Sequence, residues 1–134
     1  MYLLDTNIVS YWMRGDLEVI RRLREQPPSD LALSAITLAE ILYGITRSST
    51  RKVEHSRKIQ QIRSVLRVYP FDDGAAEEYA EVRSQLEATG HPISERDTQI
   101  AAIALAHRLT VVTHNVKEFG RVAGLAVEDW ALPA

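Results

Sequence analysis

Short apolar runs alternate with longer segments of helical spacing, and this alternation constrains the fold more than any other feature of the sequence. The apolar runs predict strands at residues 2–4, 31–34, 68–71 and 109–113, with a final edge strand at 126–128. Strands separated by helices form a parallel sheet with helices on both faces. We therefore expect an α/β fold, a three-layer α/β/α sandwich with a short, mainly parallel central sheet.

Turn and capping residues set the expected helix boundaries. The helical patterns cover residues 6–14, 17–25, 36–46, 53–66, 73–88 and 94–108. Thr6 or Asn7 can cap the first helix, and Gly90 followed by Pro92 ends the helix at 73–88. The sequence shows no repeat and no linker, and its 134 residues are the usual size of one domain. We expect a single domain spanning residues 1–134.

Composition excludes several classes of site. The chain contains no cysteine, which removes disulfides, thiolate nucleophiles and zinc–thiolate sites. Its longest apolar run, residues 100–106, is far shorter than the roughly 20 residues that span a bilayer. No basic start leads into a signal-like apolar core. We expect a cytoplasmic protein that does not enter a membrane.

The net charge of −2 hides an asymmetry along the chain. Residues 1–71 hold 11 Lys and Arg against 7 Asp and Glu, whereas residues 72–134 hold 5 against 11. The basic excess is concentrated between Arg47 and Arg67. Local basic surface favours phosphate binding, although a charge-rich helix is more often only a solvated face. Arg47, Arg51 and Lys52 are candidate contacts to a nucleic-acid backbone.

Polar residues follow the first strand and the strand at 109–113. Asp5 comes directly after residues 2–4, at the sheet edge where α/β proteins bind ligands. A helix cap is the simpler interpretation of Asp5. Thr113 and Asn115 end the later strand, and Glu118 follows in an expected short helical turn. Taken alone, this second segment is a polar loop with an Asn cap.

Glu40 is the single charged residue of the segment 34–46. On a helix it shares a face with Ile36, Ala39 and Tyr43, and the helix is apolar nearly all round, which predicts burial. A buried, unpaired carboxylate costs several kcal/mol or takes up a proton. Glu40 therefore needs a partner, either an arginine or a cation shared with other carboxylates.

Asp97 opens the helix that becomes apolar on almost every side. Ser94 followed three residues later by an acid resembles a capping box. The alternative is that Asp97 faces the sheet edge with Asp5, while Glu40 leans over the same edge. Carboxylates so close together are unfavourable unless Mg²⁺ or Mn²⁺ lies between them. Such a metal site suits phosphodiester hydrolysis.

Four segments, taken in order, resemble the motifs of PIN-domain ribonucleases, and specifically of VapC-type toxins from bacterial toxin–antitoxin pairs. They are LLDTN at 3–7, SAITLAEILYG at 34–44, DTQIAA at 97–102 and THNVKEF at 113–119. The resemblance covers nearly the whole chain. It implies a Mg²⁺- or Mn²⁺-dependent endoribonuclease in which Asp5, Glu40 and Asp97 are the main acids and the metal ligands.

The same resemblance implies roles for further residues and for partners. Glu118 would assist catalysis, Thr6 would order the pocket, and Asn115 would support the metal, its water or the substrate. Asn115 and Glu118 stand where many PIN nucleases carry aspartate, so we expect one firmly held ion. The expected partners are an RNA substrate, a second copy in a homodimer, and a VapB-type antitoxin. The antitoxin would carry the DNA-binding part and build a higher assembly.

Other functions fit the residues less well. A phosphatase with an aspartyl nucleophile usually has a second aspartate two residues on, where this chain has Asn7. A signal-receiver domain needs an acceptor aspartate after a central strand, but no acid follows Ser34 until Glu40. No Gly-rich loop supports nucleotide binding. The remaining alternative is a catalytically silent PIN-like module that only binds RNA or a partner.

Overall fold

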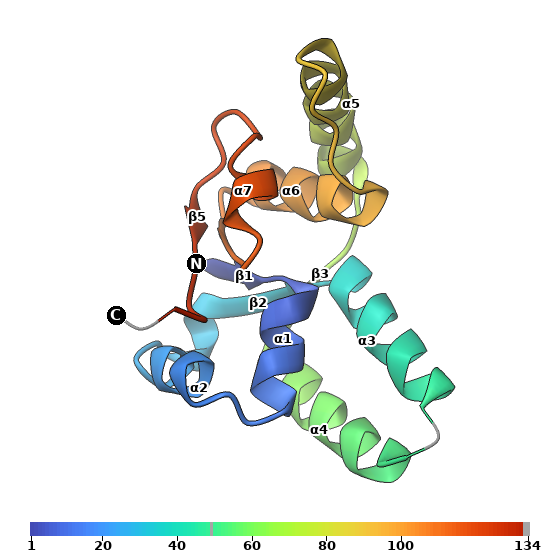
Figure 1. Ribbon diagram of the computed structural model, residues 1–134, viewed down its shortest axis with the longest axis vertical. Helices are drawn as coiled ribbons and strands as arrows, with labels where there is room; N and C mark the ends of the chain where they lie inside the picture. Colours follow the sequence, from blue (N-terminus) through green and yellow to red (C-terminus); the bar gives the residue numbers. More distant parts are fainter. Residues whose placement is uncertain (49, 133–134) are drawn as a thin grey trace.

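The computed structural model describes residues 1–48 and 50–132, in which the strands form one parallel sheet (Figure 1). The strands are β1 (Tyr2–Leu4), β2 (Leu31–Ser34), β3 (Arg67–Tyr69), β4 (Thr110–Val112) and β5 (Val127–Glu128). Their order is β3-β2-β1-β4-β5, and every neighbouring pair is parallel. The expected α/β fold with helices on both faces of a parallel sheet is confirmed, and the expected edge strand is present at residues 127–128, one residue shorter than predicted.

The helices begin and end within one residue of the boundaries that the sequence predicts. They are α1 (Thr6–Met13), α2 (Leu17–Arg24), α3 (Ala35–Arg47), α4 (Lys52–Val65), α5 (Asp73–Ala88) and α6 (Glu95–His107). A 3₁₀ turn, η1 (Pro28–Asp30), precedes β2, and α7 (Val116–Phe119) is the helical turn expected at Glu118. No helix in the described part of the chain has the length and apolarity needed to cross a membrane.

The sheet separates two hydrophobic cores. Successive strand residues point to opposite faces, so Leu4 belongs to the core under α1–α4, whereas Leu3 belongs to the core under α5 and α6. In Figure 1, α1–α4 lie below the sheet and α5–α7 lie above it. Burial of both faces explains why the strands are almost entirely apolar.

Helices α1 and α3 start directly at the carboxyl ends of the central strands β1 and β2. At each of these two junctions a polar side chain caps the helix. Asp5 has extended backbone, and its Oδ1 accepts a hydrogen bond of 3.0 Å from the amide of Ile8. Ser34 does the same for α3. The prediction that Thr6 or Asn7 caps α1 is therefore wrong, because both residues lie inside the first turn of the helix and Asp5 is its N-cap.

The prediction that α3 is buried nearly all round is also wrong. Leu38, Ile41 and Ile45 are buried, but Tyr43 is 59% exposed and Ala39 is exposed as well. Helix α3 packs on α4, α1 and the sheet and also meets α6, so part of its surface, the side that carries Tyr43, is left uncovered. Glu40 lies beside this uncovered part, with its side chain 25% exposed.

Candidate functional site

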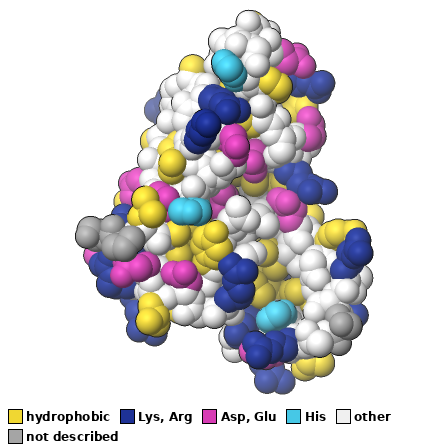
Figure 2. Space-filling model, in the orientation of Figure 1, with side chains coloured by type: hydrophobic (Ala, Val, Ile, Leu, Met, Phe, Trp, Pro, Cys, Tyr) yellow, Lys and Arg dark blue, Asp and Glu magenta, His cyan; other side chains and the backbone are white. Residues whose placement is uncertain are grey.

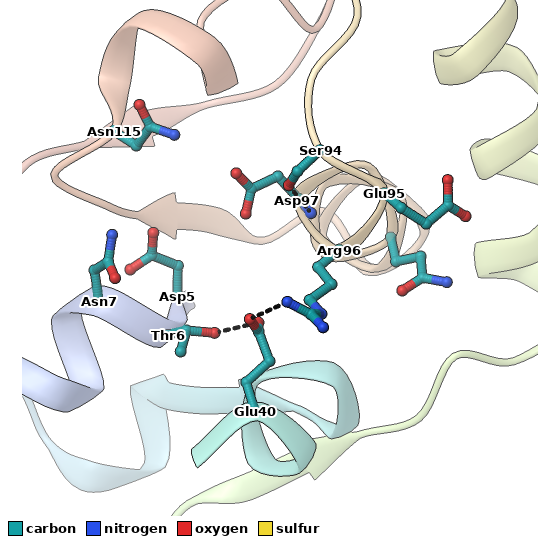
Figure 3. Close-up of a pocket in the computed structure, with 10 residues that line it drawn as sticks. Asp5, Thr6, Asn7, Glu40, Ser94, Glu95, Arg96, Asp97 and Asn115 are labelled. Carbon is teal, nitrogen blue, oxygen red and sulfur yellow. Dashed lines mark hydrogen bonds and ion pairs between the residues drawn. The ribbon is translucent and has the colours of Figure 1, made fainter. Parts of the chain in front are cut away.

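A pocket of about 590 Å³ lies at the carboxyl edge of the sheet. Four parts of the chain build it: the start of α1, the middle of α3, the start of α6 and the segment after β4 (Figure 3). Its lining residues are Asp5, Thr6, Asn7, Glu40, Ser94, Glu95, Arg96, Asp97, Gln99 and Asn115. The three acids singled out in the sequence, Asp5, Glu40 and Asp97, thus meet in one cavity although 92 positions separate the first from the last.

Asp5 is both a helix cap and a wall of this pocket. Its side chain is held by the amide of Ile8, its own amide donates to the carbonyl of Val112 at 3.0 Å, and it is only 3% exposed. Burial raises the pKa of Asp5 to about 6, against the lowering effect of the Thr113 hydroxyl and the Ile8 amide. The capping interpretation and the functional one are therefore compatible.

Asp97 directs its carboxylate into the pocket from the first turn of α6 (Figure 3). Its amide donates to Ser94 Oγ at 3.1 Å, which is one arm of a capping box. The returning bond, from the Ser94 amide to the Asp97 carboxylate, is absent from the described residues. Burial raises the pKa of Asp97, and the charges of Glu40 and Glu118 raise it further, while Ser94 and Asn115 lower it.

Glu40 reaches the same space from α3 and has two partners. The Thr6 hydroxyl donates to Glu40 Oε1 at 2.7 Å, and the Arg96 guanidinium lies 3.6 Å from Oε2. The side chain of Glu40 is 25% exposed. The sequence-based expectation of a fully buried carboxylate is thus wrong, but the arginine partner that it left open is present. The Thr6 hydroxyl orients this carboxylate, and the functional role that the resemblance implies for Thr6 stays a prediction.

The segment after β4 completes the wall. The amide of Asn115 donates to Thr113 Oγ1 at 2.8 Å, which turns the chain so that the Asn115 side chain lines the pocket. Asn115 stands at the cap position of α7 but makes no capping bond with its side chain. Glu118 lies outside the lining residues, yet its charge acts on Asp97.

The candidate backbone-binding residues lie elsewhere. Arg47, Arg51 and Lys52 are exposed around the end of α3 and the start of α4, and they do not line the pocket. Arg47 donates to the hydroxyl of Tyr43 at 2.9 Å. Figure 2 shows Lys and Arg side chains over α4 on the lower part of this face. A role of these residues in binding nucleic acid stays a prediction.

Sequence reasoning missed Arg96, the one Lys or Arg among the described residues that line the pocket. Arg96 directly precedes Asp97 in the first turn of α6, and this adjacency was the available signal. It also missed Glu95 and Gln99. The Glu95 carboxylate points away from the acids and accepts a hydrogen bond from Tyr79 of α5 (Figure 3).

The donor set fits a hard divalent ion held by few protein ligands. Within residues 1–48 and 50–132, no three His, Cys, Asp or Glu side chains are arranged to hold one ion. Mg²⁺ usually keeps several waters and binds through one or two carboxylates. Asp5 and Asp97 offer that pair of carboxylates. The negative charges of Asp97 and Glu40 raise the pKa of Asp5. A cation at this position would offset the repulsion.

Comparisons with known proteins agree with the fold. The family model described as PIN domain matches residues 2–125. Ribonuclease VapC2 of Rickettsia felis is 34% identical, covering 97% of this chain and 98% of the relative. The tRNA(fMet)-specific endonuclease VapC of Salmonella typhimurium is 33% identical, covering 96% and 97%.

Solved structures also match the fold of this chain over nearly its whole length. The chain is similar to one in the crystal structure of VapBC2 from Rickettsia felis bound to a promoter DNA fragment, with a TM-score of 0.88, 33% identity, and 96% and 98% of the two chains covered. It is also similar to a chain in the structure of FitAB bound to the IR36 DNA fragment, with a TM-score of 0.90, 35% identity, and 100% and 98% covered.

Proposed function

The chain belongs to the PIN-domain family, and we propose that it is a metal-dependent endoribonuclease toxin of the VapC type, which hydrolyses phosphodiester bonds in RNA. The observation that carries this proposal is the convergence of Asp5, Glu40 and Asp97 in one pocket at the carboxyl edge of the sheet. Full-length relatives with ribonuclease names support it. The catalytically silent alternative has no comparable support, because all three acids are present.

Asp5 and Asp97 would hold the metal, Mg²⁺ or Mn²⁺, directly or through water. When bound, such an ion would supply Lewis acidity toward the phosphate and lower the pKa of coordinated water. Both carboxylates have raised pKa values in the metal-free protein, so a cation would favour their charged forms. The Asn115 amide lies beside Asp97 and lowers its pKa, which suits a role in orienting that carboxylate.

Glu40 is the base of the proposed mechanism. Its carboxylate is held by the Thr6 hydroxyl at 2.7 Å and, among the described residues, accepts no backbone hydrogen bond, so it can accept a proton from the attacking water. In-line attack by this water would leave a 3′-hydroxyl and a 5′-phosphate. Arg96 would leave Glu40 and pair with the phosphate, since a guanidinium matches phosphate oxygens in a bidentate way.

Substrate and partners follow from the relatives. A tRNA or another structured RNA is the proposed substrate, because one relative is a tRNA(fMet)-specific endonuclease. A VapB-type antitoxin is the proposed partner, because the similar solved structures are VapBC and FitAB assemblies, and DNA would be contacted through it. We further propose a homodimer, a higher assembly with the antitoxin, and action in the cytoplasm.

The test is cleavage of total RNA by purified protein free of antitoxin. Incubation with Mg²⁺ or Mn²⁺, with EDTA, and with the Asp5→Asn variant should give fragments only when both metal and Asp5 are present. End sequencing of the fragments would name the cleaved RNA and show 5′-phosphates. A folded wild-type protein that cuts no RNA under any metal would overturn the proposal and favour the binding-only module.

A further inference from the structure

A histidine that the proposed chemistry does not use stands beside the pocket. His114 lies between Thr113 and Asn115, and its side chain is 47% exposed. Its Nδ1 lies 2.9 Å from Oδ2 of Asp129. An ionised carboxylate only accepts hydrogen bonds, so Nδ1 is the donor. Within the described residues nothing bonds Nε2, which leaves that nitrogen and the ring face available to a ligand.

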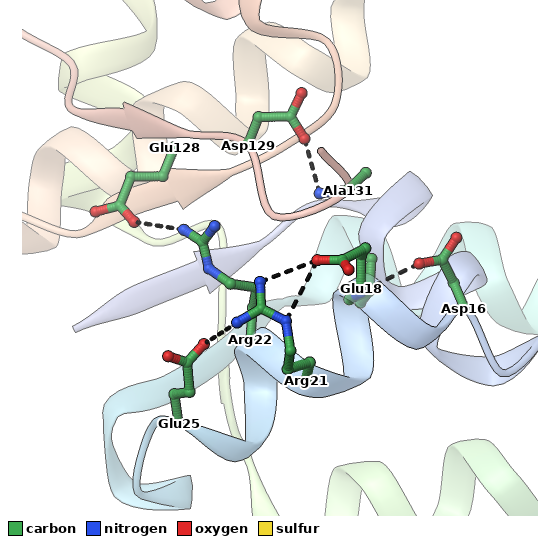
Figure 4. Close-up of polar contacts among 9 residues, drawn as sticks. Asp16, Glu18, Arg21, Arg22, Glu25, Glu128, Asp129 and Ala131 are labelled. Atoms are coloured by element: carbon green, nitrogen blue, oxygen red, sulfur yellow. Dashed lines mark hydrogen bonds and ion pairs between the residues drawn. The ribbon is translucent and has the colours of Figure 1, made fainter. Parts of the chain in front are cut away.

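Asp129 is a fixed acceptor. Its side chain is only 9% exposed, and its Oδ1 accepts a hydrogen bond of 2.9 Å from the amide of Ala131 (Figure 4). The neighbouring Trp130 is 1% exposed, and its indole donates to Glu128 at 2.9 Å. A carboxylate held in this way fixes the tautomer and the orientation of the imidazole that donates to it.

Helix α1 places an aromatic ring and a cation next to this histidine. Asn7 and Tyr11 are four residues apart and share one face of α1, and Arg14, three residues further at the C-cap, continues that face because its backbone is still helical. Asn7 lines the acidic pocket. The rings of Tyr11 and His114 lie 6.1 Å apart at 70°, and the Arg14 guanidinium lies 5.0 Å from the Tyr11 ring centroid. A continuous strip thus runs from the pocket along α1.

We propose that His114, Tyr11 and Arg14 form a binding strip for the RNA nucleotides next to the cleaved bond. Arg14 pairs with a backbone phosphate, and His114 contacts a base or sugar through its ring and Nε2, with Asp129 as its positioning residue. Aromatic and imidazole rings beside a cation are what single-stranded RNA contacts, because bases stack and phosphates need charge. The proposal rests on the proposed ribonuclease function.

A purely structural role explains less of the geometry. A hydrogen bond that ties the segment after β4 to the segment after β5 requires Asp129 and His114 only. It does not require an imidazole that is half exposed, or an exposed arginine stacked on the adjoining ring. The strip adjoins the pocket at Asn7 and Asn115, which line the pocket and neighbour the strip along α1 and along the segment after β4. An RNA strand whose phosphate lies at Asp5 and Asp97 would therefore extend over the strip.

Binding is tested with variants of the full chain in the Asp5→Asn background, so that no RNA is cut. The probe is a fluorescent single-stranded RNA of about 12 nucleotides and mixed sequence, within the length that such surfaces hold. Arg14→Ala should weaken binding about 5-fold and lower the slope of log affinity against log salt by about 1. His114→Ala should weaken it about 5- to 20-fold, and His114→Phe should recover part of the loss by keeping a stacking ring.

Arg83→Ala is the matched control, because Arg83 is an exposed arginine of α5 that pairs with Glu87, away from the strip. It should leave affinity and salt slope unchanged. In the active background, Asp129→Asn and His114→Ala should raise KM with little change in kcat, whereas a structural defect would lower the melting temperature instead. Circular dichroism checks that each variant is folded.

The outcomes separate the two proposals. RNA affinities within twofold of the parent for both Arg14→Ala and His114→Ala overturn the strip, even if the wild type cleaves RNA. Unchanged RNA affinity together with lost binding of a VapB-type antitoxin also overturns it and makes the surface a protein contact. A wild type that binds the probe through the strip but never cleaves RNA would overturn the proposed function. It would still support the strip as an RNA-binding surface.

Discussion

Asp5 shows how one side chain serves the backbone and the pocket at once. Its Oδ1 satisfies an amide at the start of α1, and its charge is buried beside Asp97 and Glu40. Because the pKa of Asp5 in the folded protein, about 6, lies above the ordinary value of 3.8, the folded state prefers the neutral acid. The charged form therefore weakens the metal-free fold: the loss of stability develops as the pH rises from about 4 to about 6 and is fully present above that.

Asp5→Asn should accordingly abolish cleavage and yet stabilise the metal-free protein. Asn caps a helix as well as Asp does, and it removes the buried charge. In EDTA above pH 7 we expect a gain on the order of 3 kcal/mol, shrinking as the pH falls from 6 to 4. Urea unfolding at several pH values measures it. Asp5→Ala is the control, since it also loses the cap, at about 1 kcal/mol. An Asn variant less stable than wild type above pH 7 would contradict the argument.

Arg96 offers a second test at the level of single residues. If its guanidinium moves from Glu40 to the phosphate, Arg96→Gln should lower kcat/KM about 10-fold or more, which is the size expected for losing one charge-assisted contact. Arg96→Lys should recover only part of the rate, because an ammonium cannot form the two-pronged contact. Steady-state kinetics on a mapped RNA measures both. Equal rates for all three proteins would show that Arg96 only neutralises Glu40.

At the level of elements, helix α3 is less well packed than its sequence suggests. Gly44 lies inside the helix with no positive φ, and a Cβ built there meets nothing within 4 Å. Glycine inside a helix costs roughly 0.5–1 kcal/mol relative to alanine. Gly44→Ala should therefore raise the unfolding free energy by about that amount and leave RNA cleavage unchanged, measured by urea unfolding and by the cleavage assay.

Gly120 provides the matched control for this prediction. A Cβ at Gly120 would lie 2.7 Å from the carbonyl oxygen of Val116, which is backbone and cannot turn away. Gly120→Ala should therefore destabilise the protein. If both substitutions changed stability in the same direction, the packing argument for the open face of α3 would fail.

The elements themselves could be predicted because their boundaries carry strong local signals. Ser94 caps α6 as expected, and Gly90 with Pro92 ends α5 where the sequence places its end, whereas the cap that Ser34 provides for α3 was not predicted. The degree of burial of Glu40 could not be predicted. Periodicity identifies the faces of a helix but does not say which of them neighbouring elements cover, and the exposed Tyr43 face of α3 is the result.

At the level of the whole molecule, the pocket depends on strand order, which local patterns do not fix. Asp5 and Asn115 come together because β1 and β4 are neighbours in the sheet. A parallel sheet predicts that both lie at one edge, and that much followed from the sequence. Arg96 was missed because its place beside Glu40 arises only when α6 and α3, from opposite sides of the sheet, meet at that edge.

Because the pocket lies where the helix layers on the two faces of the sheet meet, the proposed metal would link the two layers. Asp5 belongs to the layer of α1–α4, whereas Asp97 belongs to α6 on the other face. A ligand that binds only the folded protein stabilises it by about 2.7 kcal/mol when its concentration is 100 times Kd. Because this ion would bridge both layers, Mg²⁺ or Mn²⁺ should slow hydrogen exchange in α1 and in α6 together, and raise the melting temperature.

Hydrogen exchange followed by mass spectrometry, with and without metal, measures this coupling. In Asp5→Asn the metal should protect neither layer, although the variant is at least as stable as wild type in EDTA. Protection confined to α6 in the wild type would mean that Asp97 holds the ion without Asp5. Since the Asp5 carboxylate is more deeply buried than that of Asp97, the ion should offset a larger desolvation cost there, and we expect α1 to gain at least as much protection as α6.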